Sequence, residues 1–427
     1  MSEAPHPALA YHEEPIPGKF KIVPIKPMAT AKDLALAYSP GVAEPCLEIA
    51  KDPELAYKYT NKGNMVACIS NGTAVLGLGN IGALASKPVM EGKAVLFKKF
   101  ADVNCIDLCV DTKDPDEFIN CVKLLAPSFG GINLEDIKGP DCFYVEETLK
   151  GCMPIPVFHD DQHGTAIVCL AGLINAMEIS GKKVEDQKII CNGAGAAGIA
   201  CVKLIIAYGA KPENVFVCDT KGVIYPGRAE GMNKFKETLA NSTISKNTSL
   251  AEIAVGADVL IGVSSPKIFT EEICMSLNKD PVIFAMANPE PEVRPELAKK
   301  WRPDCIIATG RSDYPNQINN VMCFPFLFRA TLDTRSKQIN EEMKMAAALA
   351  LAGLAKLEVP ASVKEAIPGR DFTFGREYVI PTPFDPRLIS VLPVAVAKAA
   401  MASGTASHKI EDFDAYAKEL TARVQNN

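Results

Sequence analysis

Two pairs of adjacent carboxylates are the residues of this chain best suited to chemistry. Asp160 and Asp161 follow the apolar run PIPVFH, and Glu135 and Asp136 follow the run GINL. We expect both runs to be strands, and open α/β sheets bind ligands at the carboxyl ends of their strands. Three carboxylates that meet there with water would hold Mg²⁺ or Mn²⁺. The alternative is that Asp160 and Asp161 cap a helix that begins near Gly164.

Zinc is a poor candidate for this acidic group. His159 and His163 flank the pair at Asp160 and Asp161, and their spacing would place them on one face of a helix. The other three histidines stand at positions 6, 12 and 408, and no cluster of Cys and His completes a set of four ligands. A hard cation with oxygen ligands is therefore favoured.

Two further side chains are candidates for proton transfer. Lys93 follows a glycine and precedes the apolar run AVLF, which predicts an ammonium at an element boundary beside buried surface. Burial lowers the pKa of a lysine from about 10.4, and a neutral lysine can act as a base. Tyr38 is held at the bend made by Pro40 and Gly41. The alternatives are a surface lysine with a packed stem and a tyrosine packed at a helix end.

A Gly-rich turn indicates a dinucleotide site. We expect a strand at 188–192, a helix at 199–208 and a second strand at 214–218, which ends at Asp219. In this order of strand, GxGxxG, helix, strand and acid, the glycines let the backbone approach a pyrophosphate at the helix N-terminus. The turn consists of Gly193, Ala194, Gly195, Ala196, Ala197 and Gly198.

Three residues bear on the choice between NAD and NADP. Asp219 favours the ribose hydroxyls of NAD, because its carboxylate repels a 2′-phosphate. Lys221 and Arg228 follow closely and could pair with that phosphate. We favour NADP, with NAD as the alternative.

An earlier GxGxxG match, GLGNIG at Gly77–Gly82, is not assigned to the cofactor. Residues 65–70 and 74–78 are expected to form a hairpin around Asn71-Gly72. No acidic residue ends a strand about 20 residues further on, and a lone GxGxxG is weak support for a dinucleotide site.

The arrangement of elements predicts an α/β chain. Further strand-and-loop units at 258–263, 282–287 and 306–309 extend a doubly wound parallel sheet. We expect an N-terminal α/β catalytic domain and a Rossmann-like NAD(P)-binding domain. The expected division is an arm at 1–30, a catalytic domain at 31–162, a cofactor domain at 163–390 and C-terminal helices at 391–427. Residues 360–383 are expected to be irregular.

Composition argues against several classes of protein. The chain has 427 residues, of which 48% are hydrophobic and 22% charged, and its net charge is −6. This charge and the lack of a polybasic block argue against nucleic-acid binding. No apolar run reaches the roughly 18 residues of a membrane span, and we expect no secretory signal. The 14 cysteines form no CxxC pair and indicate reduced thiols in a cytoplasmic protein.

Seven ordered motifs resemble those of the malic enzymes, in their short prokaryotic-type branch, over about residues 15–400. The resemblance implies the oxidative decarboxylation of L-malate to pyruvate and CO₂, with NADP or NAD as cofactor and Mg²⁺ or Mn²⁺ as metal. The motifs are YSPGVAEP from Tyr38, Gly92-Lys93, Leu134-Glu135-Asp136, FHDDQHGT from Phe158, Gly193–Gly198, Ala287-Asn288-Pro289 and ATGRSDYPNQINN from Ala308.

The resemblance also implies a role for each matching residue. Tyr38 would be the general acid and Lys93 the general base, with Asp160 hydrogen-bonded to Lys93. The metal ligands would be Glu135, Asp136 and Asp161. The substrate, which lies next to the cofactor, would be contacted by Lys93, Asn288 and Asn320.

The resemblance has further implications for assembly and substrate binding. Short family members exchange their N-terminal segments, so we expect a homodimer in which Tyr38 reaches the partner's site. Longer relatives bind a malate carboxylate with an arginine, and this chain has Ala74 at that position. The sequence does not name the group that replaces it. A phosphotransacetylase-like extension is not expected. The alternative function is a non-decarboxylating NAD(P)-dependent dehydrogenase of the amino-acid type, which would not need the three acidic residues.

Overall fold

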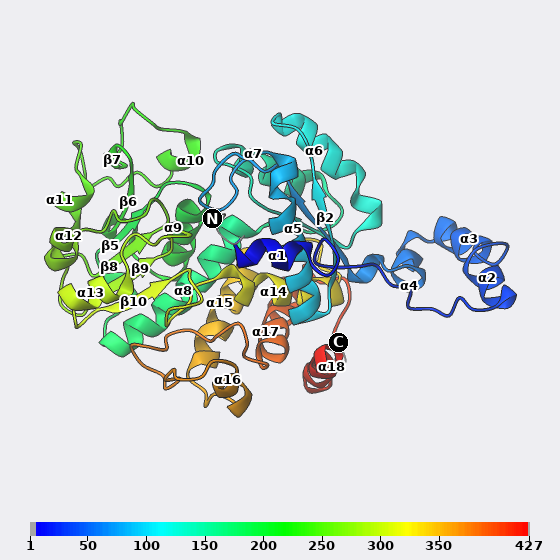
Figure 1. Cartoon of the computed structure of the whole chain (residues 1–427). Helices are drawn as coiled ribbons and strands as arrows, with labels where there is room; N and C mark the ends of the chain where they lie inside the picture. Colours follow the sequence, from blue (N-terminus) through cyan, green and yellow to red (C-terminus); the bar gives the residue numbers. More distant parts are fainter. Residues whose placement is uncertain (1–5, 426–427) are drawn as a thin grey trace, which may run out of the picture.

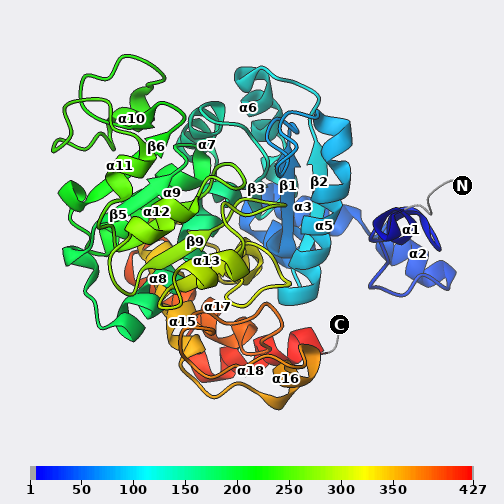
Figure 2. The same cartoon turned by 60° about the vertical axis from the view of Figure 1, so that its left-hand side comes forward.

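The computed structural model describes residues 6–425, and its first layer is a four-stranded parallel sheet. The strands run in the order β2, β1, β3, β4, of which the first three are labelled in Figure 2. Successive residues of β1 point to opposite faces, as the period of a strand requires. Val66 and Cys68 pack with Phe97 of α5, and Ala67 and Ile69 pack on the other face of the sheet. The bounds are β1 Met65–Ser70, β2 Asn104–Cys109, β3 Gly131–Leu134, β4 Val157–His159, α5 Ala83–Ala101, α6 Pro115–Leu124 and α7 Asp141–Cys152.

A second sheet has six strands in the order β10, β9, β8, β5, β6, β7. All neighbours are parallel except β6 and β7, which are antiparallel at the edge. Figure 2 shows this sheet beside the first one. The bounds are β5 Ile189–Asn192, β6 Val215–Asp219, β7 Gly222–Val223, β8 Val259–Gly262, β9 Val282–Ala285, β10 Ile306–Thr309, α9 Ala196–Tyr208, α10 Lys234–Glu237, α11 Leu250–Ala254, α12 Glu271–Ser276 and α13 Pro295–Trp301.

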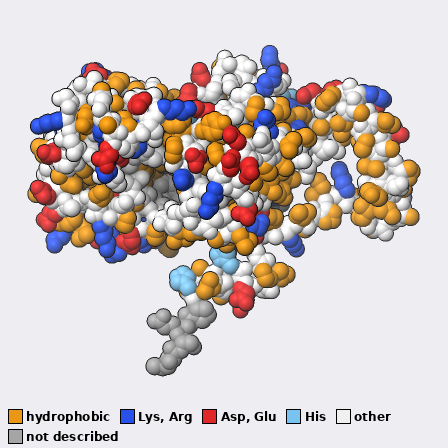
Figure 3. Space-filling view, turned by 90° about the horizontal axis from the view of Figure 1, so that it is seen from above, with side chains coloured by type: hydrophobic (Ala, Val, Ile, Leu, Met, Phe, Trp, Pro, Cys, Tyr) orange, Lys and Arg blue, Asp and Glu red, His pale blue; other side chains and the backbone are white. Residues whose placement is uncertain are grey.

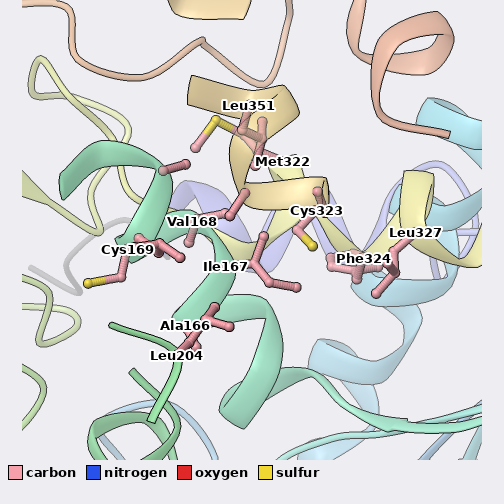
Figure 4. Packing of buried hydrophobic residues seen from close by; sticks show 14 of the residues in the cluster. Ala166, Ile167, Val168, Cys169, Leu204, Met322, Cys323, Phe324, Leu327 and Leu351 are labelled. Carbon is pink, nitrogen blue, oxygen red and sulfur yellow. The ribbon is translucent and has the colours of Figure 1, made fainter. Parts of the chain in front are cut away.

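Helix α8, Asp160–Ser180, links the two sheets and lies in the largest core. After a polar first turn it is largely apolar on all sides, and it packs against α9, α15 and the 3₁₀ turn at Asn320–Met322. Figure 4 shows Ile167 and Val168 of α8 among Met322, Phe324 and Leu351 from the later helices. By length and composition alone α8 could cross a membrane, although no apolar run of that length was expected. However, 67% of its apolar stretch is buried inside the protein, as in a core helix.

The C-terminal helices complete this core. α14 and α15 pack against α17, which in turn packs against α18. The stretch 360–383, expected to be irregular, contains the short helix α16. The bounds are α14 Phe324–Asp333, α15 Glu341–Ala355, α16 Ala361–Ala366, α17 Leu388–Ala402 and α18 Phe413–Gln425.

The N-terminal helices contribute nothing to the buried cores. Helices α1 Pro7–Glu13, α2 Ala31–Ala37, α3 Ala43–Lys51 and α4 Ala56–Tyr59 contain no buried residue. Figures 1 and 3 show α2 and α3 as a lobe at the right, separated from the body and rich in exposed apolar side chains. We call residues 29–51 the N-terminal lobe.

Two local predictions were wrong, and so was the alternative that Asp160 and Asp161 cap a helix. The predicted returning strand at 74–78 is a turn with a single bridge between Val75 and Gly79. Lys93 lies in the middle of α5 and not at an element boundary. Helix α8 begins at Asp160, four residues before Gly164, and neither aspartate is its N-cap, which is His159 without a capping side chain.

Candidate functional site

A cleft of about 800 Å³ lies between the two sheets. Loops that follow strands of both sheets form its walls, which is where open α/β sheets bind ligands. The side chains that carry charge or hydrogen-bonding groups in it include Lys19, Lys93, Glu135, Asp136, Lys138, Asp161, Ser264, Asn288 and Asn320.

Lys93 projects from α5 into this cleft. Its side chain is 8% exposed, and its Nζ donates a hydrogen bond to Oδ2 of Asp160. Nζ also lies 3.0 Å from Oε1 of Glu135 and 4.3 Å from the centre of the Phe324 ring. The predicted hydrogen bond between Lys93 and Asp160 is therefore present, although the expected position of Lys93 in the helix was wrong.

The charge state of Lys93 differs from the expectation. Burial lowers the pKa of Lys93, but the carboxylates of Asp160 and Glu135 outweigh burial and hold the pKa above its ordinary value. In the absence of another cation, Lys93 is therefore an ammonium paired with these carboxylates.

The three predicted metal ligands come together in the cleft. Glu135, Asp136 and Asp161 each offer an oxygen, and these oxygens all lie within 4.8 Å of one another. The backbone N–H of Asp136 donates to Oδ2 of Asp161 at 2.8 Å, and Asn133 donates to Oε2 of Glu135 at 2.9 Å. Asp136 adopts the left-handed conformation with φ 54°, which aspartate tolerates better than most residues.

These carboxylates fit a divalent cation. Burial and the nearby carboxylate of Asp161 together raise the pKa of Asp136 to about 9 and that of Glu135 to about 7, against the opposing charge of Lys93. Oδ2 of Asp136 is buried and has no hydrogen-bond partner among the described residues. Buried carboxylates that crowd one another require neutralisation, and a hard cation with oxygen ligands supplies it.

The first turn of α8 positions the two aspartates. Because Asp160 and Asp161 are its first residues, their carboxylates lie at the end of the helix that favours negative charge. A Cβ at Gly164 would lie 1.9 Å from Oδ1 of Asp160, so only glycine leaves this carboxylate in place.

Helix α7 supports this turn through Glu146, which the sequence analysis missed. The buried carboxylate of Glu146 accepts from the backbone N–H of His159 at 3.1 Å and contacts Nε2 of His163 at 2.9 Å. Lys150 pairs with it at 2.7 Å. Burial raises the pKa of Glu146, but the charges of His163 and Lys150 outweigh burial and hold it well below its usual range. No sequence motif marks Glu146, since His159 and His163 lie on other elements and only the fold brings them to it.

The Gly-rich turn between β5 and α9 has the close packing expected of a dinucleotide site. A Cβ at Gly198 would lie 1.7 Å from the carbonyl oxygen of Gly193, and Gly193 itself has φ 126°. Gly195, Ala196 and Ala197 line the cleft, so the N-terminus of α9 opens onto it.

At the end of β6, Asp219 is surrounded by cations. Arg228 Nη2 lies 2.5 Å and Lys236 Nζ 2.7 Å from Oδ2 of Asp219. Burial raises the pKa of Asp219, but hydrogen bonds from Arg228 and Lys236 outweigh burial and lower it to about 2. The predicted phosphate contact Lys221 pairs with Glu230 at 2.5 Å. Lys236 was not anticipated, because it lies beyond an irregular segment.

The two predicted substrate contacts, Asn288 and Asn320, both line the cleft near Lys93. The loop of the early GxGxxG match lies against Asn288, since a Cβ at Gly77 would be 2.4 Å from its carbonyl oxygen. The absence of a side chain at Gly77 thus allows the backbones of the two halves of the chain to approach closely. Ala74 also lines the cleft, and the exposed Lys138 is, with Lys19, one of two lining lysines that form no ion pair with any described residue.

Tyr38 is not brought to this cleft within the chain. It caps the C-terminus of α2 in the N-terminal lobe, is 71% exposed, and is not among the described residues that line the cleft. The arm before it does reach the cleft: His12 and Lys19 line it, and Lys19 Nζ donates to the carbonyl oxygen of Pro88 at 2.5 Å.

Comparison with known proteins agrees with the two halves of the chain. A family model described as the N-terminal domain of malic enzyme matches residues 17–150. A second, described as the NAD-binding domain of malic enzyme, matches residues 162–368. The structure resembles the crystal structure of a malic enzyme from Pyrococcus horikoshii with a TM-score of 0.89 and 40% identity. The match covers 98% of this chain and 95% of that one.

Two curated relatives come from Rhizobium meliloti. An NADP-dependent malic enzyme is 59% identical over 97% of this chain and 54% of its own length. An NAD-dependent malic enzyme is 52% identical over 98% of this chain and 54% of its own length. This chain thus spans about half the length of the curated relatives that it matches most strongly. With both family domains matched in order, the chain belongs to the malic enzyme family.

Proposed function

We propose that this protein catalyses the metal-dependent oxidative decarboxylation of L-malate to pyruvate and CO₂ with reduction of NADP. The observation that carries the proposal is the cleft in which Lys93, three clustered carboxylates and the Gly-rich turn face one another. We propose the same division of the chain as the sequence analysis, with the boundary near residues 162 and 163, and a cytoplasmic location. The 14 free cysteines support that location.

Glu135, Asp136 and Asp161 would hold a divalent cation, Mg²⁺ or Mn²⁺. Such a cation supplies a Lewis acid for the oxygen at C2 of malate. Its charge would also offset the charges of Glu135 and Asp161, two of the carboxylates that keep the proton on Lys93. Burial, which favours the neutral amine, would then be opposed mainly by Asp160.

Lys93 and Tyr38 would carry the protons of the reaction. Nζ of Lys93 would accept the proton of the C2 hydroxyl group as malate is oxidised, and the nicotinamide supplies the hydride acceptor. Oxidation must come first, since it creates the β-keto acid that can lose CO₂. The hydroxyl of Tyr38 would then donate a proton to C3 of the resulting enolate, which gives pyruvate. Asp160 would keep Lys93 in place through its hydrogen bond.

Tyr38 would act in the cleft of a second copy of the chain, in a homodimer. This part of the proposal rests on the N-terminal lobe, whose exposed apolar residues include Leu34 at 54%, Leu36 at 67% and Leu47 at 55% exposure. A contiguous apolar surface of this kind marks an interaction site.

The contacts at the end of β6 support NADP. Arg228 and Lys236 neutralise Asp219 and leave a net positive charge, which suits a 2′-phosphate. Asn288 and Asn320 would contact the malate and the nicotinamide end of the cofactor. Lys138 would bind the malate carboxylate for which this chain, with Ala74, has no arginine.

The test is an assay of the purified protein with L-malate and Mn²⁺, with NADP or NAD in parallel, by absorbance of the reduced nicotinamide. We expect reduction with NADP, loss of the rate on addition of a chelator, and pyruvate in an amount equal to the cofactor reduced. Reduction that persists with chelator and forms no CO₂ would favour the non-decarboxylating dehydrogenase. No reduction with either cofactor would refute the assignment to malate.

A further inference from the structure

A second cavity, of about 190 Å³, lies on the opposite side of the first turn of α8 from the cleft. It shares no residue with the cleft: Asp161 and Thr165 of α8 face the cleft, and Gln162 and Ala166 face the cavity. Its other walls come from α7, α9, α10 and α15, so that it touches elements of both sheets.

Most charged groups of the cavity are already paired. Glu146 pairs with Lys150, Glu341 with Lys344, and Glu147 with Lys234 outside the cavity. The ring of His163 is also engaged, since Nε2 lies 2.9 Å from Oε1 of Glu146 and Nδ1 lies 3.2 Å from Nζ of Lys344. These groups form a framework with little net charge.

Two polar groups of the cavity remain without a partner. Gln162 is only 4% exposed, and its Nε2 has no hydrogen-bond partner among the described residues. Lys203 of α9 has no carboxylate within 4.0 Å among residues 6–425 and lies exposed where the cavity meets solvent. A buried amide without a partner is costly, so a group that accepts its hydrogen bond belongs there.

The remaining wall is apolar. Phe143 of α7 and Phe235 of α10 stack with ring centres 4.3 Å apart, and Ile199 and Leu204 of α9 complete the surface. Figure 4 shows Leu204 close to Ala166, at the edge where α9 meets α8. The volume is several times the ~30 Å³ that one water occupies in the liquid.

We propose that this cavity is a binding site for a small carboxylic acid with an apolar body. The carboxylate would accept hydrogen bonds from Nζ of Lys203 and Nε2 of Gln162, which are the two donors without partners. The apolar body would lie against Phe143 and Phe235. An occupant would contact α7 of the first sheet and α9 behind the cofactor turn, next to the helix turn that carries Asp161.

The test uses benzoate as the probe and benzyl alcohol as its uncharged counterpart, with binding measured by titration calorimetry on the full chain. We expect saturable benzoate binding, weakened about tenfold or more by Lys203→Met, because a charge-assisted hydrogen bond is lost. Ala200→Leu, which fills the cavity, should also weaken it. Lys211→Met, an exposed lysine beyond the end of α9 that pairs with Asp186, is the control and should change nothing.

The measurement separates the cavity from the cleft and does not depend on the proposed reaction. Benzoate that binds at the cleft instead would be displaced by malate with Mn²⁺ and would be insensitive to Lys203→Met. That result, or no saturable binding, or equal binding of benzyl alcohol, would overturn the proposal. Benzoate binding that needs Lys203 would stand even if the protein failed to oxidise malate.

Discussion

At the scale of single residues, the cleft contains one buried ammonium whose positive charge is opposed by several buried carboxylates. Lys93 contacts Asp160 and Glu135, whereas Oδ2 of Asp136 has no hydrogen-bond partner within residues 6–425. Since each carboxylate is buried, the group is short of positive charge until a divalent cation joins it. The same reasoning identifies which other cations of the cleft are free to meet a substrate.

Lys138 is the residue we expect to bind the malate carboxylate. Replacing it with methionine should raise the KM for malate about tenfold, with a smaller change in kcat, because a charge-assisted hydrogen bond to the substrate is lost. Lys138→Arg should retain most of the affinity. Steady-state kinetics with malate varied at saturating NADP and Mn²⁺ measures both. If Lys138→Met left the KM unchanged, another group would have to bind this carboxylate.

Lys236 should contribute to cofactor choice. Lys236→Gln leaves Arg228 as the only cation that pairs with Asp219, so kcat/KM for NADP should fall about tenfold, while the value for NAD should change little. Lys234→Gln is the matched control, since Lys234 is two residues away and pairs with Glu147. Parallel assays with the two cofactors give the ratio. A similar decrease with both would show that Lys236 acts on something other than the 2′-phosphate.

At the scale of elements, α7 holds the first turn of α8 in place. The carboxylate of Glu146 is the acceptor that joins α7 to His159 and His163, and these residues flank Asp160 and Asp161. The position of the two aspartates thus depends on a residue that does not itself face the cleft.

Glu146→Gln should therefore lower the free energy of unfolding by about 2 kcal/mol, as expected for a buried charge-assisted hydrogen bond. The folded-state pKa of Glu146 is below its ordinary 4.5, so its stabilisation is complete above that pH and is lost as the pH falls through the lower, folded-state value. The difference between wild type and variant should therefore be constant near neutral pH and shrink on acidification. Urea unfolding at several pH values measures it.

Glu147→Gln is the control for this prediction. Glu147 is on the same helix but is 60% exposed, and its contact with Lys234 is 3.7 Å, so its replacement should cost no more than about 0.5 kcal/mol. If both variants unfolded with equal free energies, the link between α7 and α8 would not be a stabilising one.

The elements themselves were largely predictable, because strand and turn signals are local. The strand before Gly193, the helix after it and the strand that ends at Asp219 all stand where the sequence placed them. Lys93 was misplaced because a glycine before it suggested a boundary, whereas Gly92 lies inside α5, whose packing on the sheet outweighs the weak helix propensity of glycine. Glu146 and Lys236 were not predictable, since their partners are brought to them only by the fold.

At the scale of the whole molecule, the cleft within one chain has a proposed base but not its proposed acid. Tyr38 is in the N-terminal lobe, where no residue of α2 or α3 is buried, and the lobe does not pack onto the body. Exposed apolar side chains gathered on a segment held away from the core mark an interaction site. A second copy of the chain would cover it and would also complete the cleft.

Mixing two inactive variants tests this arrangement. Tyr38→Phe removes the acid and Lys93→Ala removes the base, and each variant alone should be nearly inactive. In a randomly exchanged mixture about half of the dimers are heterodimers, and each of these has one site with both residues intact, so about a quarter of wild-type activity should return. Assays before and after subunit exchange measure the recovery. If the mixture stayed inactive although heterodimers were detected, Tyr38 would have to act within its own chain, by movement of the lobe onto the body.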